Sequence, residues 1–432
     1  MNKPLFLEAF LQYIWQYGLF DHSNLCTTQG EPVVVLSAGQ KNRHDGPDFF
    51  NARLQIGETQ WAGNVEIHLK TSDWLLHKHQ NDPAYQNVVL HVVYEADVPI
   101  YDHLEKILPC IELYRRIPPH LYRNYLSLLA DNTFIPCEKL FPQVDAFTQA
   151  TWLDRLLVER LEQKITPALV LLEQNSFNWE ETFWQLLARA MGSKANAQAF
   201  EMTARNLPIT LLAKHKDNLL QLEALLLGQA GLLEADFKEE YPQYLQREYR
   251  HLKHKYTLQP INGAMWKFGG LRPPNFPTVR LAQTAMLIFR SHHLFSKIIA
   301  EPDLKKLRQL FVVQLTGYWQ THYLPDKPTA ERPKRMGADM VNNLLINTIV
   351  PMLFLYAKER ALPDLQDRAL QLLEQLPPEQ NAIIEGYQKL GYGIKSAFDS
   401  QAILQLYNAY CMPKKCLSCA IGSKLLQSEN EV

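Results

Sequence analysis

The sequence predicts an α+β protein in which a mixed β-sheet domain with flanking helices precedes a larger all-α domain. Residues 31–115 contain five short runs rich in β-branched and aromatic residues, which Gly, Pro, Asn and Asp interrupt. After about residue 118, apolar residues recur every three or four positions, which is typical of amphipathic helices. We therefore expect an α/β domain over 1–140 and a helical domain with a Cys-containing tail over 141–432.

Length and composition exclude several classes of protein. A chain of 432 residues is too long for one ordinary core, and 47% hydrophobic with 21% charged residues is typical of packed globular proteins. The net charge of -1 gives no overall attraction to nucleic acid or anionic membranes, so such binding needs a local patch. The longest apolar run, residues 342–360, is too polar to span a bilayer. We expect a cytoplasmic protein without a membrane segment.

Local patterns define the elements in chain order. Residues 5–17 place apolar side chains three and four positions apart, which predicts a helix. Ser72 or Asp73 is the expected cap of a short helix between the third and fourth strands, and Pro83 limits its length. Long helical segments follow at 151–174 and 181–207, and four more are expected at 219–233, 276–295, 304–319 and 365–376. The five strands are expected at PVVVLSAG, FFNARLQIG, TQWAGNVEIHLK, NVVLHVVYEAD and ILPCIELY.

The third of these strands carries a row of polar residues. Glu66, His68 and Lys70 alternate with apolar neighbours, so they point to one face of the strand. This row is either a solvated face or part of a site. A hairpin through the IGETQ turn would bring Asp48 close to Glu66, and two adjacent carboxylates repel unless a cation such as Mg²⁺ or Mn²⁺ lies between them.

Pro47-Asp48 and Glu66-Ile-His68 resemble the motif of the PD-(D/E)XK nuclease superfamily. The resemblance implies a restriction-endonuclease-like αβββαβ fold and a Mg²⁺- or Mn²⁺-dependent nuclease with Asp48 and Glu66 as metal ligands. His68 stands where the motif has Lys, so either His68 or Lys70 would act as the base, or the protein would be a catalytically inactive nucleic-acid-binding or scaffold protein. The accessory positions of the superfamily correspond to Glu8 on the first helix and Gln80 on the later helix, with Tyr85 nearby.

Four histidines offer a different metal site. His68, His77, His79 and His91 fall within 24 residues. Imidazoles together with a carboxylate suit Zn²⁺ or Fe²⁺, and such a site would hydrolyse its substrate through a metal-bound hydroxide. The sequence therefore leaves a His-rich metallohydrolase open as an alternative.

Cysteines gather at the C-terminus. Cys411, Cys416 and Cys419 have C-x4-C-x2-C spacing, and Cys137 is the best candidate for a fourth ligand. The alternatives are reduced cysteines, a structural Zn²⁺ or an iron–sulfur cluster. Some nucleases of the superfamily named above have a similar iron–sulfur site, built from one distant Cys and a C-terminal trio with a different spacing.

The helical region contains a basic segment. Between Arg247 and Lys297 there are nine Lys or Arg residues and one acidic residue. Arg272 and Arg280 flank an expected helix start and would bind phosphate, while Trp266 and Phe276 would stack on nucleic acid bases. Salt bridges to acidic helices are the alternative use of the same charges.

Most of the chain also resembles a family of uncharacterised bacterial proteins, found mainly in the Bacteroidota, that is known as a domain of unknown function. The motifs that show this resemblance are VEIHLKTSDWLLHKH, LEALLLGQAGLL, LRPPNFPTVRLAQ and CLSCAIG. The resemblance implies a cytoplasmic protein and brings no established activity.

Overall fold

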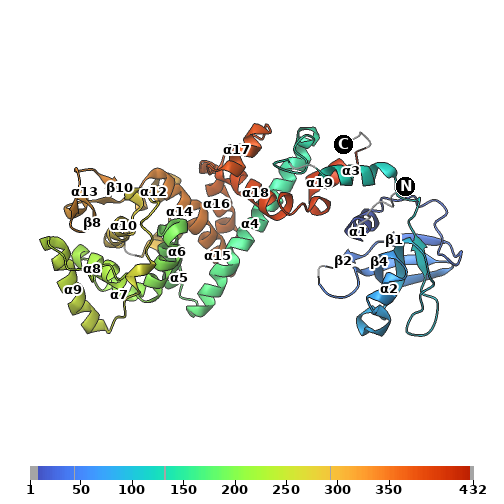
Figure 1. Ribbon diagram of the computed structural model, residues 1–432, viewed down its shortest axis with the longest axis horizontal. Coiled ribbons are helices and arrows are strands. Elements are labelled where there is room, and N and C mark those ends of the chain that lie inside the picture. Colours follow the sequence, from blue (N-terminus) through green and yellow to red (C-terminus); the bar gives the residue numbers. More distant parts are fainter. Residues whose placement is uncertain (1–7, 43, 131–132, 292, 429–432) are drawn as a thin grey trace. The chain divides into compact units, whose positions relative to one another are not determined.

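The protein divides into two compact units in a computed structural model that describes residues 8–42, 44–130, 133–291 and 293–428 (Figure 1). The sheet unit comprises residues 1–152 and 407–432, and the helical unit comprises residues 153–406. This confirms the expected mixture of an N-terminal mixed sheet with a large helical region. The sequence placed the boundary near residue 140 and the tail with the helices, whereas the C-terminal 26 residues belong to the sheet unit.

All five predicted strands are present in one mixed sheet, in the order β1-β3-β4-β5-β6. β3 pairs antiparallel with β1 and β4, whereas β4, β5 and β6 run parallel, and β2 joins the edge of β3. Gly57, with a φ of 59°, forms the tight turn between β3 and β4. The strands are β1 (Val33–Ser37), β2 (Gln40–Lys41), β3 (Phe49–Ile56), β4 (Thr59–Lys70), β5 (Val88–Glu95) and β6 (Cys110–Glu112).

Both faces of the central strand β4 are covered. Helix α1 (Glu8–Tyr17) buries Phe10, Leu11 and Ile14 and contacts β4. The crossover from β4 to the parallel strand β5 contains α2 (Asp73–Leu76) and two 3-10 turns, η1 (His79–Asn81) and η2 (Pro83–Tyr85). Parallel strands require such a crossover. It brings a histidine-containing segment back over the sheet.

The C-terminal tail packs within the sheet unit. It comprises the π-helix η7 (Tyr407–Cys411), the 3-10 turn η8 (Cys416–Ser418) and helix α19 (Ala420–Leu426). Tyr13 Oη lies 2.9 Å from Ser423 Oγ, and Asn124 Nδ2 on α3 (Pro119–Ala130) donates to the carbonyl oxygens of Leu426 and Ser428. The two ends of the chain are therefore parts of one core.

The helical unit is built around α8 and α10, which pack together. Gly228 on α8 allows close approach of the Tyr249 ring, since an added Cβ would lie 2.1 Å from it. The larger helices are α4 (Ala146–Gln174), which begins in the sheet unit, α5 (Trp179–Met191), α6 (Ser193–Arg205), α8 (Leu219–Gln229), α9 (Glu240–Tyr256), α10 (Pro277–Arg290), α15 (Val350–Glu359), α16 (Pro363–Gln375) and α18 (Ala397–Leu406).

Shorter elements connect these helices. Residues 304–319, expected as one helix, instead form α12 (Leu304–Leu310), β7 (Gln314–Leu315) and the start of α13, because β-branched residues and Gly317, with a φ of 61°, interrupt the helix. The remaining elements are α7 (Ile209–Ala213), η4 (Gly263–Met265), η5 (Pro273–Asn275), α11 (Leu294–Ala300), α13 (Tyr318–Thr321), β8 (His322–Leu324), β9 (Lys327–Pro328), β10 (Lys334–Arg335), α14 (Ala338–Leu344), the π-helix η6 (Leu345–Ile349) and α17 (Ala382–Lys389); η3 (Phe141–Gln143) lies in the sheet unit.

One continuous helical stretch, Ala338–Glu359, is long and apolar enough to cross a membrane. Of its most apolar part, 72% is buried inside the unit, which is the pattern of a core helix.

Candidate metal centre

Backbone hydrogen bonds hold Asp48 and Glu66 next to each other where β3 begins to pair with β4. The backbone N–H of Asp48 donates to Glu66 Oε2 at 3.0 Å, and the backbone N–H of Ile67 donates to Asp48 Oδ2 at 3.1 Å. Gln12 on α1 donates to the other Asp48 oxygen at 2.7 Å. The hairpin thus brings the two predicted carboxylates to one site, and α1 fixes the orientation of the first.

Three histidines meet beside this pair. The imidazole nitrogens of His68, His77 and His79 all lie within 4.8 Å of one another. His68 belongs to β4 and is 1% exposed, so the solvated-face alternative is excluded for it, as it is for Glu66 at 5%. His77 and His79 follow α2 in the crossover, and His77 is exposed. The centre therefore has a buried side on the strand and an open side at His77.

The spacing of these atoms fits one metal ion. His68 Nε2 lies 3.1 Å from His77 Nδ1 and 3.5 Å from Glu66 Oε1, and His79 Nε2 lies 3.4 Å from the same Glu66 oxygen. Two ligands at the usual zinc distances in a tetrahedral site lie about 3.4 Å apart. The donor atoms are thus already at the separation that a first-row metal requires.

His91, on the neighbouring strand β5, contacts the ring of His68. The parallel register of β4 and β5 places His91 opposite Glu66, and its Nε2 lies 2.9 Å from His68 Nδ1. If His68 Nε2 is to offer a lone pair to a metal, its Nδ1 must carry the proton and donate it to His91. His91 is fully buried, and its Nδ1 has no hydrogen-bond partner among the described residues.

The electrostatics favour a bound cation. Burial raises the pKa of Asp48 to about 7, with the Glu66 charge adding to the effect, and burial raises the pKa of Glu66 to about 8. Burial and the neighbouring imidazoles lower the pKa of His68 to about 2, and burial lowers that of His91 to about 3. The imidazoles of His68 and His91 are therefore neutral at pH 7, and a metal-ligating imidazole must be neutral.

Glu8 and Tyr85 lie at the edge of the centre. Burial raises the pKa of Glu8, and the Asp48 charge raises it further. The Tyr85 ring stacks on His79 with centroids 3.8 Å apart, and burial followed by the charges of Glu66 and Asp48 raises the pKa of its phenol to about 12. Sequence reasoning missed Gln12, although it lies one turn from Glu8 on the same helix.

Two other predicted residues lie apart from the ligand cluster. The Lys70 side chain is about half exposed, and its ammonium lies 3.9 Å from Asp97 Oδ2. The carboxylate of Asp97 also accepts hydrogen bonds from Thr71 and Ser72, which fixes the end of β4. Gln80 is exposed in η1, beside a small cavity that Tyr85 also lines. His68 has both ring nitrogens engaged by other histidines.

The four candidate cysteine ligands come together elsewhere in the sheet unit. Cys137, Cys411, Cys416 and Cys419 are all buried and none forms a disulfide. Burial raises the pKa of the Cys137 thiol, and the other three cysteines raise it further through their charges. All four thiols are therefore buried in the sheet unit, and a shared metal remains a prediction.

Two of the predicted binding side chains of the basic segment are buried and form hydrogen bonds within the helical unit. Trp266 is 6% exposed and its indole N–H donates to the Ala230 carbonyl, so it has no free face for a base. Arg280 is 8% exposed and donates to Gln283 and Asn275. Arg272 is exposed, and Phe276 packs edge-on against Phe268. The structure thus places Trp266 and Arg280 in the core rather than on a nucleic-acid-binding surface.

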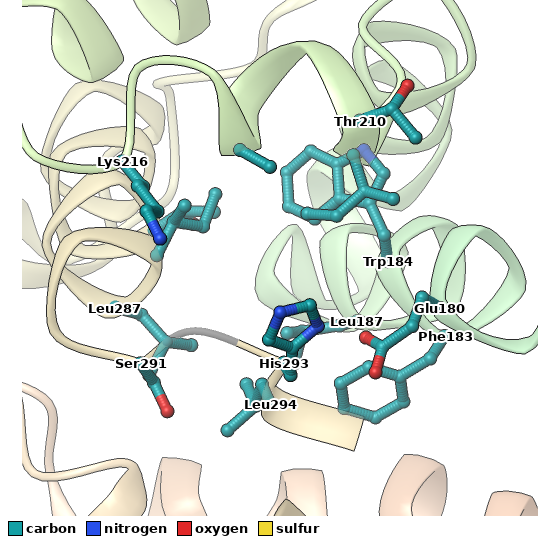
Figure 2. A pocket seen from close by; sticks show the side chains of 14 residues that line it. Glu180, Phe183, Trp184, Leu187, Thr210, Lys216, Leu287, Ser291, His293 and Leu294 are labelled. Carbon is teal, nitrogen blue, oxygen red and sulfur yellow. The ribbon is translucent and has the colours of Figure 1, made fainter. Parts of the chain in front are cut away.

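The helical unit also contains an apolar cavity of about 300 Å³ between α5, α7, α10 and α11. Figure 2 shows Phe183, Trp184, Leu187, Leu287 and Leu294 on its walls. Glu180 also lines the cavity, and its carboxylate accepts hydrogen bonds from Ser296. Such walls suit an apolar ligand and supply no cluster of metal ligands among the described residues.

Comparisons with known proteins agree with the broad resemblance seen in the sequence. No curated protein and no solved structure matches the chain. Residues 8–382 match the family described as "Protein of unknown function (DUF2851)". Because this match spans most of the sequence, the chain belongs to the DUF2851 family.

Proposed function

We propose that the protein is a metal-dependent phosphodiesterase of the nuclease type, with its centre at Asp48, Glu66, His68, His77 and His79. One observation carries the proposal: the imidazoles of His68, His77 and His79 and the buried Glu66 carboxylate converge at metal-ligand spacing, with the buried Asp48 carboxylate beside Glu66. The chain runs α1-β1-β2-β3-β4-α2-β5, which departs from the αβββαβ order that the PD-(D/E)XK resemblance implies by the short strand β2. Phosphodiester substrates, DNA or RNA, are part of the proposal through that resemblance.

The donor set favours certain metals. Magnesium prefers oxygen ligands, whereas imidazole suits Zn²⁺, Mn²⁺ and Fe²⁺ better. We therefore expect the nitrogen-rich side of the centre to select a transition metal, with Mn²⁺ the ion that both donor types accept. Such an ion would supply a water molecule of lowered pKa and a positive charge beside the phosphoryl oxygens.

The protein groups have separate roles in this proposal. Glu66, His68, His77 and His79 hold the ion, the first two from its buried side, and Gln12 orients Asp48 beside them. Exposed His77 marks the side from which substrate enters. Neither His68, whose Nδ1 meets His91 and whose Nε2 would face the ion, nor Lys70, beside Asp97, is placed to take a proton from water. Glu8 on α1 is a remaining carboxylate for that role, and burial and the neighbouring Asp48 charge raise its pKa.

The test compares cleavage of labelled single- and double-stranded DNA and RNA with Mn²⁺, Zn²⁺ or Mg²⁺. We expect cleavage by the wild type with Mn²⁺ and a loss of at least about 100-fold in Glu66→Gln and Asp48→Asn, as for other transition-state electrostatic groups. Glu58→Gln is the matched control, because Glu58 lies in the exposed turn at the far end of β4. Metal binding is measured separately by calorimetry.

Two results would count against the proposal. If Glu66→Gln and Glu58→Gln cleaved as well as the wild type, the activity would come from another site or a contaminant. If the wild type bound Mn²⁺ through these residues but cleaved no nucleic acid, the protein would be a binding or scaffold protein that retains the fold and the metal. Failure to bind any of the three ions would remove the metal centre itself.

A further inference from the structure

The helical unit contains a second cavity, which shares no lining residue with the apolar cavity of Figure 2. Its volume is about 690 Å³, and its walls come from α4, α5, α6, α14, η6 and α15. Of the described residues that line it, three are cations, Lys164, Arg189 and Lys194, and none is Asp or Glu. The other walls are apolar or carry amide and hydroxyl groups. A cavity of this size suits a small ligand, and its cationic lining favours an anion.

Lys164 reaches the cavity from a network of buried amides. Its Nζ donates to Asn347 Oδ1 on η6 at 2.7 Å and to Gln401 Oε1 on α18 at 2.5 Å. Arg160, one turn earlier on α4, donates to the same Gln401 oxygen at 2.8 Å. An ammonium group has three N–H donors, and Lys164 has no third acceptor among the residues that the structure describes. One donor of Lys164 is therefore left for a ligand in the cavity.

A single carboxylate, that of Glu379, completes this network. Asn347 Nδ2 donates to Glu379 Oε1 at 3.1 Å, and Gln401 Nε2 donates to the other oxygen. The Glu379 charge thus acts on both Arg160 and Lys164 across the two amides. Burial lowers the pKa of Lys164 to about 7, and the Arg160 charge lowers it further, although Glu379 opposes the change. An anion in the cavity would favour the charged ammonium.

The second carboxylate beside the cavity is also shared by two cations. Glu201 on α6 pairs with Arg189 on α5 and with Arg205, one turn further along α6. Lys194, exposed at the start of α6, has no ion-pair partner within the described part of the chain. Around the cavity, five cations therefore face two carboxylates, Glu201 and Glu379, which leaves three positive charges in excess.

The wall formed by η6 departs from a regular α-helix. Leu345–Ile349 form a π-helix between α14 and α15. Pro351 has no backbone N–H, so the carbonyl of Asn347, four residues earlier, cannot receive the usual helical hydrogen bond. Short π-helices occur frequently at functional sites. Here the π-helix carries Asn347 and Thr348, which both line the cavity.

We propose that this cavity binds a phosphate monoester with a small organic body, whose charge Lys164, Arg189 and Lys194 balance. A phosphate monoester carries about 1.5 to 2 negative charges at pH 7, so it matches the positive excess better than a monocarboxylate does. The cavity is much larger than inorganic phosphate, and its apolar wall, which includes Met340 and Met352, suits an organic body. The site lies wholly in the helical unit and does not depend on the metal centre of the sheet unit.

The test is isothermal titration calorimetry of the full chain, first freed of metal by a chelator and dialysed, so that no metal ion offers phosphate a second site. The ligands are adenosine monophosphate, a hexose monophosphate, adenosine, inorganic phosphate and benzoate. We expect at least one of the two esters to bind about 10-fold or more tightly than the other three compounds, because only the esters combine a doubly charged phosphate with an organic body.

Variants locate the binding. Lys194→Met and Arg189→Met should each weaken ester binding by about 10-fold or more, since each removes a charge-assisted contact. Both side chains are exposed, so these variants keep the test decisive if Lys164→Met fails to fold. Lys358→Met is the matched control and should leave the affinity unchanged, because Lys358 on α15 pairs with Glu162 and does not line the cavity.

Three results would overturn the proposal. Binding of adenosine as tightly as adenosine monophosphate, or tighter binding of benzoate than of either ester, would remove the phosphate assignment. Equal affinities in Lys194→Met, Arg189→Met and Lys358→Met would place the binding outside this cavity. Wild-type protein that binds neither ester would remove the site itself, and it would leave the metal centre unaffected.

Discussion

The histidine–carboxylate centre and the cysteine cluster lie in the same unit but differ in every property that governs metal binding. The first offers nitrogen and oxygen donors from a strand and a crossover loop, and exposed His77 opens it to solvent. The second offers only thiol sulfurs from loops and helix ends, and all of them are buried. An accessible site with mixed ligands suits an exchangeable ion, whereas a closed thiolate site suits a permanent one. The comparison therefore favours a chemical role for the histidine–carboxylate centre and a structural role for the cysteine cluster.

The largest expected effect concerns stability. If the four thiols hold a structural metal, Cys416→Ser should lower the unfolding midpoint of the sheet unit by about 10–20 °C, because loss of such a centre removes roughly 5 kcal/mol of folding free energy. His77→Ala should abolish metal binding at the other centre and change the midpoint of the metal-free protein by less than about 2 °C, because His77 is exposed. Differential scanning calorimetry of both variants tests the contrast. Equal shifts would mean that the two centres do not differ in role.

The next effect is a pH dependence that only the histidine–carboxylate centre should show. The pKa values of Asp48 and Glu66 rise from 3.8 and 4.5 to about 7 and about 8 in the folded state. A raised carboxyl pKa contributes stability that is complete below the unfolded pKa and is lost as the pH rises through the folded pKa. The metal-free protein should therefore lose several kcal/mol of stability between about pH 4 and pH 8, since each unit of pKa shift corresponds to about 1.4 kcal/mol.

Denaturant unfolding across this pH range, with and without Mn²⁺, measures the effect. Bound Mn²⁺ should flatten the profile by pairing with both carboxylates. Glu223 in the helical unit provides the control, because burial raises its pKa to about 7 and it accepts hydrogen bonds from Trp319 and Tyr241. The stability that Glu223 contributes should also fall as the pH rises, but Mn²⁺ should not change it. A profile that Mn²⁺ leaves unchanged would argue against carboxylate ligation.

The smallest effect sharpens the role of His91. His91→Phe keeps an aromatic ring in the core but removes the nitrogen that meets His68 Nδ1. Loss of such a supporting group lowers metal affinity by about 10- to 100-fold. Lys70→Ala is the control. Lys70 lies on β4, which pairs with β5, but its ammonium lies beside Asp97, so this change should leave the metal affinity unchanged. Competition titrations with a metal indicator give both values, and an unchanged affinity in His91→Phe would show that His68 is not a ligand.

Local patterns predicted much of the fold. The five strands and α1 were found because alternating or three-to-four-residue spacing is visible within a few residues. The convergence of Asp48 and Glu66 could also be predicted, since a tight turn fixes the register of a hairpin and only 18 residues separate the two acids. Residues 304–319 were expected as one helix and break into three elements, because short-range spacing does not reveal where tertiary packing ends a helix.

The basic segment shows the opposite outcome. Charge counting suggested a phosphate site, but Arg280 lies on α10, a helix that neighbours cover on nearly all sides. Its guanidinium therefore meets Gln283 and Asn275 instead of solvent. Burial depends on which helices pack around α10, and the sequence of α10 contains no record of its neighbours.

The sequence by itself determined the ligand types, the hairpin that joins Asp48 to Glu66, and the two groups of His and Cys residues. Only the tertiary structure decided which of these atoms share a site. The parallel pairing of β4 with β5 sets His91 against His68, and the return of the tail sets the cysteine trio against Cys137. Such contacts depend on the free energy of long-range packing, which no local window of sequence contains.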